Sequence, residues 1–452
     1  MKDRLRDALK HSAADYAEVR VEFSEHASLA WRGREVESAA SGSFCGGIAR
    51  ACTRGGWGIA TFDALDDLPG AVRQACECAA LVGRETTQLA DAPPHETDCP
   101  AAMRRDFRGV GLDEKLRLIA RYNEIVLGAH PAIQSSMVAY SDSFRTVHFA
   151  STRGTSYMEE RPRLHCMISA VARDGKLVQR AYESVASCTD YGDVTGLEQT
   201  AREVAERAAA LLAAPKCASG PQAVILNPRM AGVFVHEAFG HLSEADFLHE
   251  NPKMRELMRV GRPIGVRGLN VVDDGSLPGL QGSQRFDDEG TPTRKTYLIR
   301  EGVLAGHLHS LESAARMGAP PTGNARAIGR SSPPIVRMTN TYIENGDTPV
   351  DELFAGVERG VYACDAFGGQ TQMEMFTFSA AYGYRIENGK RGDLVRDITL
   401  TGNVFETLNS IDGFADDLTL TQSGGGCGKG GQGPLPVSFG APHVRLRHVV
   451  IG

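Results

Sequence analysis

Two histidines spaced five residues apart set the tightest constraint on how this chain can fold. His236 and His241 flank Glu237 in the run HEAFGH, which follows the apolar residues VFV. Two imidazoles and a carboxylate can hold a divalent metal, but zinc-binding helices usually carry their histidines four residues apart, on one face. Five residues of a regular α-helix turn the second ring away by roughly 140°. Both rings therefore reach one ion only if the helix widens, and we predict a π-type widening with Gly240 absorbing the distortion.

A metal site of this kind needs a third protein ligand from another part of the chain. Cys427 is the first candidate, because it lies in SGGGCGKGGQG, which we expect to be a glycine-dense loop with a closely approaching backbone, and because a thiolate suits zinc. That segment does not match the phosphate-binding pattern G-x-x-x-x-G-K-[ST], since Gly430 follows Lys429. Other side chains stay open as ligands or as partners that orient the ligands: Glu244, Asp246, His249, and the pair His307 and His309, which is more typical of a structural or surface pair. The alternative is that His236 and His241 are incidental residues of an ordinary helix.

Size, charge and cysteine content exclude several classes of protein. The 452 residues are enough for two or three domains with buried cores. The net charge is −7 with both signs interspersed and no basic stripe, so we do not expect nucleic acid as the main partner. No apolar run reaches the roughly 18 residues of a membrane span, and the charged N-terminus lacks a signal peptide's apolar core. Ten scattered cysteines without paired spacing indicate reduced thiols and a cytoplasmic location.

Periodicity predicts an α+β fold in two domains. Helical periodicity marks four segments: 2–14, 67–82, 113–130 and 195–214. The segment Tyr16–Glu25 alternates apolar and polar residues, as a half-buried strand does. A Pro/Gly/Ser stretch at 215–222 suggests a boundary. We therefore expect an N-terminal α+β domain over 1–216 and a β-rich C-terminal domain over 217–452, which carries the HEAFGH helix.

Several longer segments resemble the TldD/PmbA family of metallopeptidases, also called modulators of DNA gyrase. ADYAEVRVEFSE and GGWGIATF are similar to the family's opening, and HEAFGHLSEADF is similar to the metal helix of its catalytic TldD branch. PPTGNARA, RMTNTYIENGD and GCGKGGQGPLPVSFGAPHVRL are similar to its later signatures. The resemblance implies that His236, His241 and Cys427 hold one divalent metal, zinc or else iron, and that Glu237 is the catalytic carboxylate. The chain departs from the family form of TldE-paired enzymes at LSEAD, where that form has GLEGD, which leaves partner and substrate preference open.

The function implied is a zinc-dependent peptidase that hydrolyses short or unfolded peptides. Glu237 would act as general base and later deliver the proton to the leaving amine. Arg330, Tyr382 and Tyr384 are candidates for stabilising the oxyanion. The resemblance also implies peptides bound as an added β-strand and a dimer, either with a second copy or with a metal-free PmbA/TldE-type paralogue.

Three other functions compete with this interpretation. The chain could be a non-catalytic peptide-binding subunit of a TldD/PmbA complex, or a metal-dependent amidohydrolase acting on a small molecule. It could also be a gyrase- or DNA-associated regulator, although the acidic balance argues against a protein that binds nucleic acid.

Overall fold

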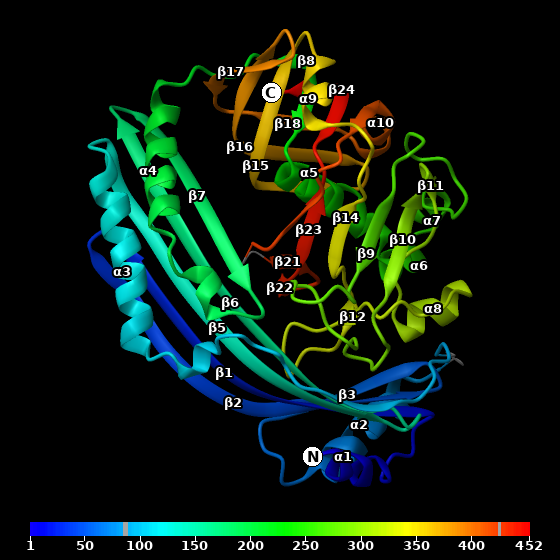
Figure 1. Cartoon of the computed structure of the whole chain (residues 1–452). Coiled ribbons are helices and arrows are strands. Elements are labelled where there is room, and N and C mark those ends of the chain that lie inside the picture. The colour runs from blue at the N-terminus through cyan, green and yellow to red at the C-terminus, as the bar shows by residue number, and fades with distance from the viewer. Residues whose placement is uncertain (85–88, 424–425) are drawn as a thin grey trace.

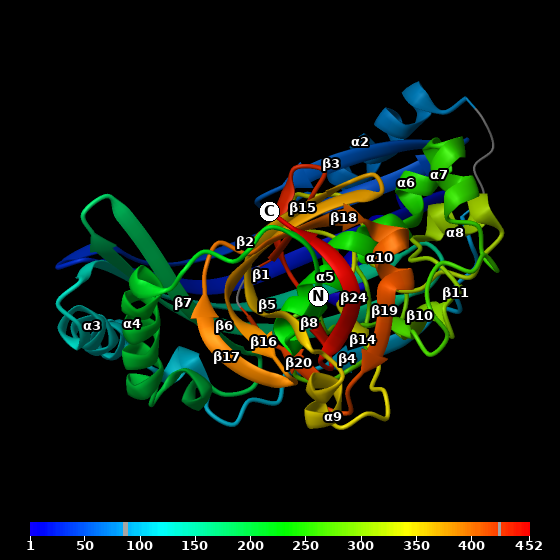
Figure 2. The same ribbon diagram turned by 90° about the horizontal axis from the view of Figure 1, so that it is seen from above.

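The computed structural model describes residues 1–84, 89–423 and 426–452, and it is an α+β structure of two bodies. Residues 1–213 form a long curved sheet with helices on its outer side, and residues from 220 onward form a β-rich body against its inner side (Figure 1). Seen from above, the second body lies over the long strands (Figure 2). The expected α+β class and the β-rich C-terminal region are confirmed. Within the described ranges, no helix is long and apolar enough to cross a membrane.

The N-terminal sheet has seven strands in the order β3-β2-β1-β5-β6-β4, with β7 paired to β6. All neighbours are antiparallel except β4 and β6. The strands are β1 (Tyr16–Arg32), β2 (Glu35–Thr53), β3 (Gly56–Phe62), β4 (Glu96–Cys99), β5 (Ile133–Ser151), β6 (Ser156–Asp174) and β7 (Leu177–Ser187).

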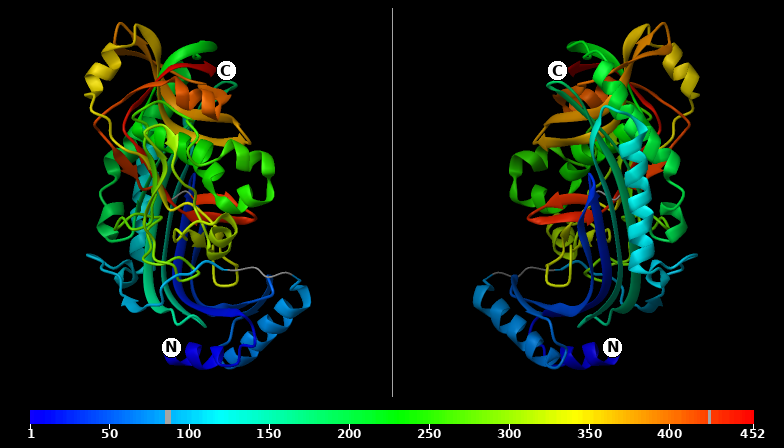
Figure 3. Two further views of the ribbon diagram at one scale, coloured as in Figure 1. Left: turned by 90° about the vertical axis from the view of Figure 1, so that its right-hand side faces the viewer. Right: turned by 90° about the vertical axis from the view of Figure 1, so that its left-hand side faces the viewer.

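Four helices cover the outer face of this sheet near its two ends (Figures 1 and 3). They are α1 (Lys2–Leu9), α2 (Leu68–Val82), α3 (Leu112–Ala129) and α4 (Glu198–Ala213). Each coincides with a segment of predicted helical periodicity, although α1 is shorter than expected. Helices α1 and α2 pack on one apolar cluster that includes Val19 and Val21, and α3 and α4 pack on another that includes Leu29. All three residues are odd-numbered, so they share one face of β1.

The opposite face of β1 carries charged side chains and is also buried. Glu18, Arg20 and Glu22 are at most 3 % exposed, and Arg20 donates hydrogen bonds to the carbonyls of Gly329 and Ser332 in the C-terminal body. The prediction of a half-buried strand was therefore wrong. The polar face of β1 looks solvated in the sequence, but it is covered by a body that begins 200 residues later.

The C-terminal body is built on two sheets. A six-stranded sheet has the order β11-β10-β9-β14-β23-β20. Its strands are β9 (Val271–Asp274), β10 (Lys295–Arg300), β11 (Val303–Leu304), β14 (Asn340–Ile343), β20 (Thr419–Thr421) and β23 (Ser438–Ala441). A seven-stranded sheet has the order β15-β8-β24-β18-β16-β17, with β19 on β24, and it closes on itself because β15 also pairs with β16. Its strands are β8 (Gly220–Leu226), β15 (Arg359–Gln372), β16 (Met375–Glu387), β17 (Lys390–Val395), β18 (Thr399–Asn403), β19 (Ile411–Phe414) and β24 (Val444–Ile451).

Among the described residues, two short hairpins and six α-helices complete this body. The hairpins are β12 (Ala325–Arg326) with β13 (Ile335–Val336), and β21 (Gly426–Lys429) with β22 (Gln432–Pro436). The helices are α5 (Pro228–Val235), α6 (Ala245–Glu250), α7 (Pro252–Leu257), α8 (Leu311–Met317), α9 (Val350–Ala355) and α10 (Val404–Ser410). Helix α5 contributes Met230 and Phe234 to the large apolar core that both sheets share. The residues that follow α5 are therefore fixed at the centre of the body.

Buried ion pairs join the two bodies. Arg161 on β6 lies 2.8 Å from Asp288, and both side chains are at most 4 % exposed. Arg50 on β2 lies 2.6 Å from Glu18 and 3.3 Å from Glu289. Asp288 and Glu289 belong to the C-terminal body, so these pairs fix how the sheet and that body sit against each other.

Candidate metal centre

The helix that carries the two histidines widens where the sequence predicts it. Asn227 caps α5 by accepting a hydrogen bond from the Met230 N–H at 2.8 Å. The regular helix ends at Val235, and His236–Gly240 forms a π-helical turn before a 3-10 turn over His241–Ser243. The predicted local widening is confirmed, and it is what lets two rings five residues apart face a common point.

Contrary to the prediction from the sequence, Gly240 does not absorb a backbone distortion in this turn. Its backbone angles, φ −57° and ψ −47°, are those of an ordinary helix. A Cβ atom at this position would lie 2.1 Å from the sulfur of Met338. The glycine therefore supplies room for Met338 rather than conformational freedom.

The widened helix brings both imidazoles to a cysteine from the far end of the chain. Cys427 lies on β21, and its Sγ is 3.2 Å from Nε2 of His241. The rings of His236 and His241 are 5.6 Å apart between centroids, at 79°. One ligand atom from each of the three residues lies within 4.8 Å of the other two, and no other such His, Cys, Asp or Glu group occurs within the described ranges.

These three residues fit a divalent metal. His236 is 2 % exposed, and its Nδ1 is buried without a hydrogen-bond partner. Burial, with smaller contributions from His241 and two nearby arginines, holds the pKa of His236 well below its usual value, so the ring is neutral and able to bind a cation. Two imidazoles and a thiolate are a donor set typical of zinc.

A buried carboxylate and a lysine hold His241 from the other side of its ring. Nδ1 of His241 lies 3.0 Å from Oε2 of Glu244, which is fully buried. Nζ of Lys429 lies 3.1 Å from the same oxygen and 2.6 Å from Asp246. Burial alone would lower the pKa of His241, but the hydrogen bonds to Cys427 and Glu244 outweigh it and raise the pKa to about 10. Glu244 therefore orients His241 and favours its charged form while no metal is bound.

Glu237 lies beside the three residues and is more accessible than they are. Its Oε2 is 3.7 Å from Nε2 of His241, and its side chain is 32 % exposed. Burial of the carboxylate raises its pKa above the usual value, against the opposing charge of His241. A carboxylate that holds a proton nearer neutral pH is suited to proton transfer.

The other residues predicted as ligands or oxyanion stabilisers are not part of the His–His–Cys cluster among the described residues. Asp246 contacts Lys429, whereas the side chain of His249 lies outside the described residues. The three oxyanion candidates make their contacts elsewhere: Arg330 with Asp63, Tyr382 with Arg207, and Tyr384 with Arg391. None of these contacts involves the His–His–Cys cluster, so the structure gives no support to an oxyanion role for them.

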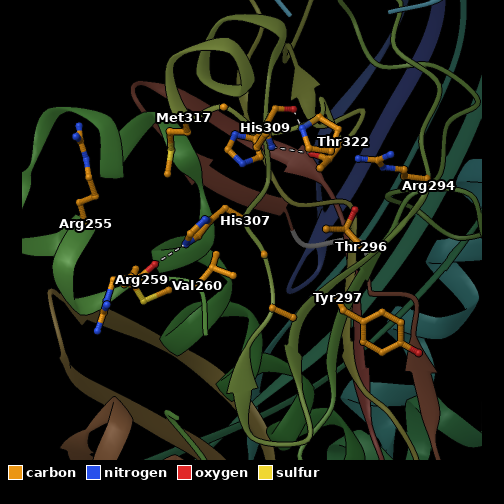
Figure 4. Close-up of a pocket in the computed structure, with 16 residues that line it drawn as sticks. Arg255, Arg259, Val260, Arg294, Thr296, Tyr297, His307, His309, Met317 and Thr322 are labelled. Carbon is orange, nitrogen blue, oxygen red and sulfur yellow. Dashed lines mark hydrogen bonds between the residues drawn. The ribbon is translucent and has the colours of Figure 1, made fainter. Parts of the chain in front are cut away.

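His307 and His309 line a separate cavity (Figure 4). Nε2 of His307 lies 2.8 Å from the carbonyl oxygen of Met258, and Nδ1 of His309 lies 3.3 Å from Oγ of Ser313. Neither ring is part of the cluster around His241.

Sequence reasoning missed the residues that position Cys427. The guanidinium of Arg337 donates to the carbonyls of Cys427 and Gln432, and that of Arg326 donates to the carbonyls of Met338 and Pro436. Both arginines are at most 2 % exposed. A buried arginine carries no periodic signal, so the sequence could not identify them.

Lys429 was not predicted either. Residues two apart on a regular strand face the same side, but the pairing of β21 with β22 is irregular between Cys427 and Lys429. The glycine-rich segment therefore has no regular alternation from which the position of Lys429 could be predicted.

Comparison with known proteins places the chain among metallopeptidases. It matches the models of three PmbA/TldA metallopeptidase domains: domain 1 over 17–79, the central domain over 105–212 and the C-terminal domain over 219–452. It is 42% identical to a metalloprotease of Synechocystis sp. over 98% of this chain and 95% of that protein. It is 32% identical to a zinc metalloprotease TldD homolog of Saccharolobus solfataricus over 75% of this chain and 76% of that protein.

Solved structures share the whole fold. A crystal structure named as a modulator of a DNA gyrase from Thermotoga maritima superposes with a TM-score of 0.81 at 21% identity, covering 100% of this chain and 99% of that one. The structure of TldE from Thermococcus kodakarensis gives a TM-score of 0.78 at 19% identity, with 100% and 99% covered. The predicted resemblance is confirmed: the chain belongs to the TldD/PmbA family of metallopeptidases.

Proposed function

We propose that the chain is a zinc-dependent peptidase that hydrolyses short or unfolded peptides. The observation that carries this proposal is the convergence of His236, His241 and Cys427 beside the partly exposed carboxylate of Glu237. A zinc ion held by these three residues, or iron in its place, would act as a Lewis acid on the peptide carbonyl.

Side chains of the protein transfer the proton and position the metal ligands. Oε2 of Glu237 accepts a proton from the attacking water, and the same carboxylate then delivers it to the leaving amine nitrogen. Glu244 holds the ring of His241 in place through Nδ1. Arg337 holds the backbone of Cys427.

Three further observations bear on the substrate, the partner and the location of the protein. The family resemblance supports peptides bound as an added strand, a mode that reads main-chain hydrogen bonds and tolerates many side chains. The fold shared with TldE supports a dimer, with a second copy or with a metal-free paralogue of the same fold. All ten cysteines are free thiols, which supports a reducing, cytoplasmic environment. Light scattering of the purified chain, alone and with such a paralogue, tests the dimer.

Hydrolysis of an unstructured peptide by zinc-loaded protein, followed by mass spectrometry, tests the function. Glu237→Gln should bind one zinc per chain yet cleave at least about 100-fold more slowly, because the proton acceptor is lost. Glu256→Gln, at an exposed glutamate, is the matched control and should cleave like the wild type.

Three outcomes would count against the proposal. Cleavage by Glu237→Gln at the wild-type rate would show that Glu237 is not the general base. Bound zinc with no cleavage of any unstructured peptide by the wild type would favour the peptide-binding subunit. Salt-sensitive DNA binding would favour the gyrase-associated regulator.

A further inference from the structure

A second cavity lies apart from the metal centre, between α7, β10 and the turn after α8 (Figure 4). Its volume is about 490 Å³, within the range of small-molecule sites. Its walls include apolar side chains: Met258, Val260, Met317, Ala319 and Pro320. None of His236, Glu237, His241 and Cys427 lines it, so it is not part of the site proposed for hydrolysis.

Two buried, neutral imidazoles line this cavity. His307 and His309 are 6 % and 3 % exposed. Burial lowers the pKa of both rings, to about 4 for His309, so neither is charged at neutral pH. A carbonyl oxygen can only accept, so Nε2 of His307 donates to Met258 and Nδ1 is left as an acceptor. No described residue hydrogen-bonds to this Nδ1 or to Nε2 of His309.

The two imidazole nitrogens without described partners offer hydrogen bonds that a bound molecule would satisfy. Thr296 on β10 also lines the cavity, but its Oγ1 is buried, so this hydroxyl is not among the groups that contact a ligand.

Arginines line the cavity, and none of the lining residues that the structure describes is acidic. Arg255, Arg259 and Arg294 contribute three guanidinium groups. Arg259 forms an ion pair with Glu256 at 3.6 Å, and such a pair is weak because each side chain is more than 70 % exposed. Among the described residues, no carboxylate lies within ion-pair distance of Arg294. The guanidinium fork matches a carboxylate, to which it can donate two parallel hydrogen bonds.

We propose that this cavity binds a carboxylate attached to an apolar group, either a free organic acid or the C-terminal residue of a peptide. The arginines bind the carboxylate, the apolar wall contacts the body of the ligand, and the two imidazoles orient it. The site does not depend on the metal or on hydrolysis.

Binding to metal-free protein tests this proposal without reference to peptidase activity. Three probes are titrated into protein stripped with EDTA: 3-phenylpropionate, N-acetyl-alanyl-phenylalanine and the C-terminal amide of that dipeptide. Methyl-¹³C methionine signals report the place of binding. Both acids, or one of them, should shift Met258 and Met317, which line the cavity, and leave Met338 beside the metal helix unchanged. The amide should bind at least tenfold more weakly than its acid.

Variants of exposed arginines test the charge contribution. Arg259→Gln with Arg294→Gln should weaken binding of the acid at least tenfold. Arg267→Gln, at an exposed arginine that does not line the cavity, should change it less than twofold. Binding of 3-phenylpropionate alone would identify a free acid as the ligand, and tighter binding of the dipeptide acid would identify a peptide C-terminus. The proposal is overturned if neither acid binds saturably, or if the amide binds as tightly as a dipeptide acid that itself binds. It is also overturned if the signal of Met338 shifts in place of those of Met258 and Met317.

Discussion

His241 is contacted on both sides of its ring. Sγ of Cys427 lies 3.2 Å from Nε2, and Oε2 of Glu244 lies 3.0 Å from Nδ1. A carboxylate on the far nitrogen of a ligating histidine fixes the ring and makes it a better donor. The buried ammonium of Lys429 balances the charge of Glu244. A metal between Nε2 and Sγ would therefore meet a ring that is already oriented.

Replacing Glu244 with glutamine should weaken zinc binding about 10- to 100-fold, because the ring loses a charged acceptor while the side chain keeps its size. Competition with a chromogenic chelator measures the affinity. Glu256→Gln, at an exposed glutamate, should bind zinc like the wild type. An unchanged affinity in Glu244→Gln would show that the carboxylate does not support the metal site.

Zinc uptake should release at least one proton per site near pH 7.5. The pKa of metal-free His241 is raised to about 10, so the ring is protonated below that pH and must lose its proton to bind a cation. The apparent affinity should accordingly rise as the pH is raised towards 10. Calorimetry in two buffers of different ionisation enthalpy counts the protons. Heats that do not depend on the buffer would contradict this protonation state.

At the scale of secondary-structure elements, the sequence predicts local helix geometry but not the tertiary contacts that explain individual residues. The spacing of His236 and His241 requires a widened helix, and the helix widens. The reason for Gly240 is its contact with Met338, almost 100 residues later, which no local pattern records. Cys427 could be chosen for its chemistry, but its segment was expected to be a loop and is the hairpin β21–β22. The choice of Glu244 over Asp246 as the partner of His241 also required the structure.

Gly240→Ala should destabilise the protein by about 1–3 kcal/mol, because the added methyl group overlaps the sulfur of Met338. Met338→Ala should relieve this overlap, so the double variant should be more stable than the sum of the two single effects by about 1 kcal/mol. Chemical unfolding of all four proteins measures the coupling.

Gly128→Ala in α3 is the matched control for this experiment. It has no heavy atom within 4 Å of the added Cβ, and alanine in a helix should be neutral or stabilising by up to about 1 kcal/mol. Additive effects of Gly240→Ala and Met338→Ala would contradict the packing reason given for Gly240.

At the scale of the whole molecule, charged residues bury the inner face of the long sheet. Alternation along β1 predicted its apolar face correctly, but the sequence gives no sign that Glu18 and Arg20 are covered by the C-terminal body. Their partners follow much later in the chain. The boundary between 216 and 217 stays a prediction, although α4 ends at Ala213 and β8 begins at Gly220.

Arg161→Met should destabilise the protein by about 3–5 kcal/mol, because it leaves Asp288 buried without its charge partner. Lys10→Met, which breaks the exposed pair with Asp7, should leave the free energy of unfolding nearly unchanged. Equal effects of the two substitutions in denaturant unfolding would show that the contact between the bodies does not depend on the buried pair.

X-ray absorption at the zinc edge tests the central claim most directly, because it reports the atoms bound to the metal. In the zinc-loaded protein we expect two imidazole nitrogens at about 2.0–2.1 Å and one sulfur at about 2.3 Å. Cys427→Ser should remove the sulfur shell, and Cys364→Ser, at a buried cysteine outside the cluster, should leave it intact. A wild-type spectrum without sulfur, or a sulfur shell that survives Cys427→Ser, would contradict the metal centre described above.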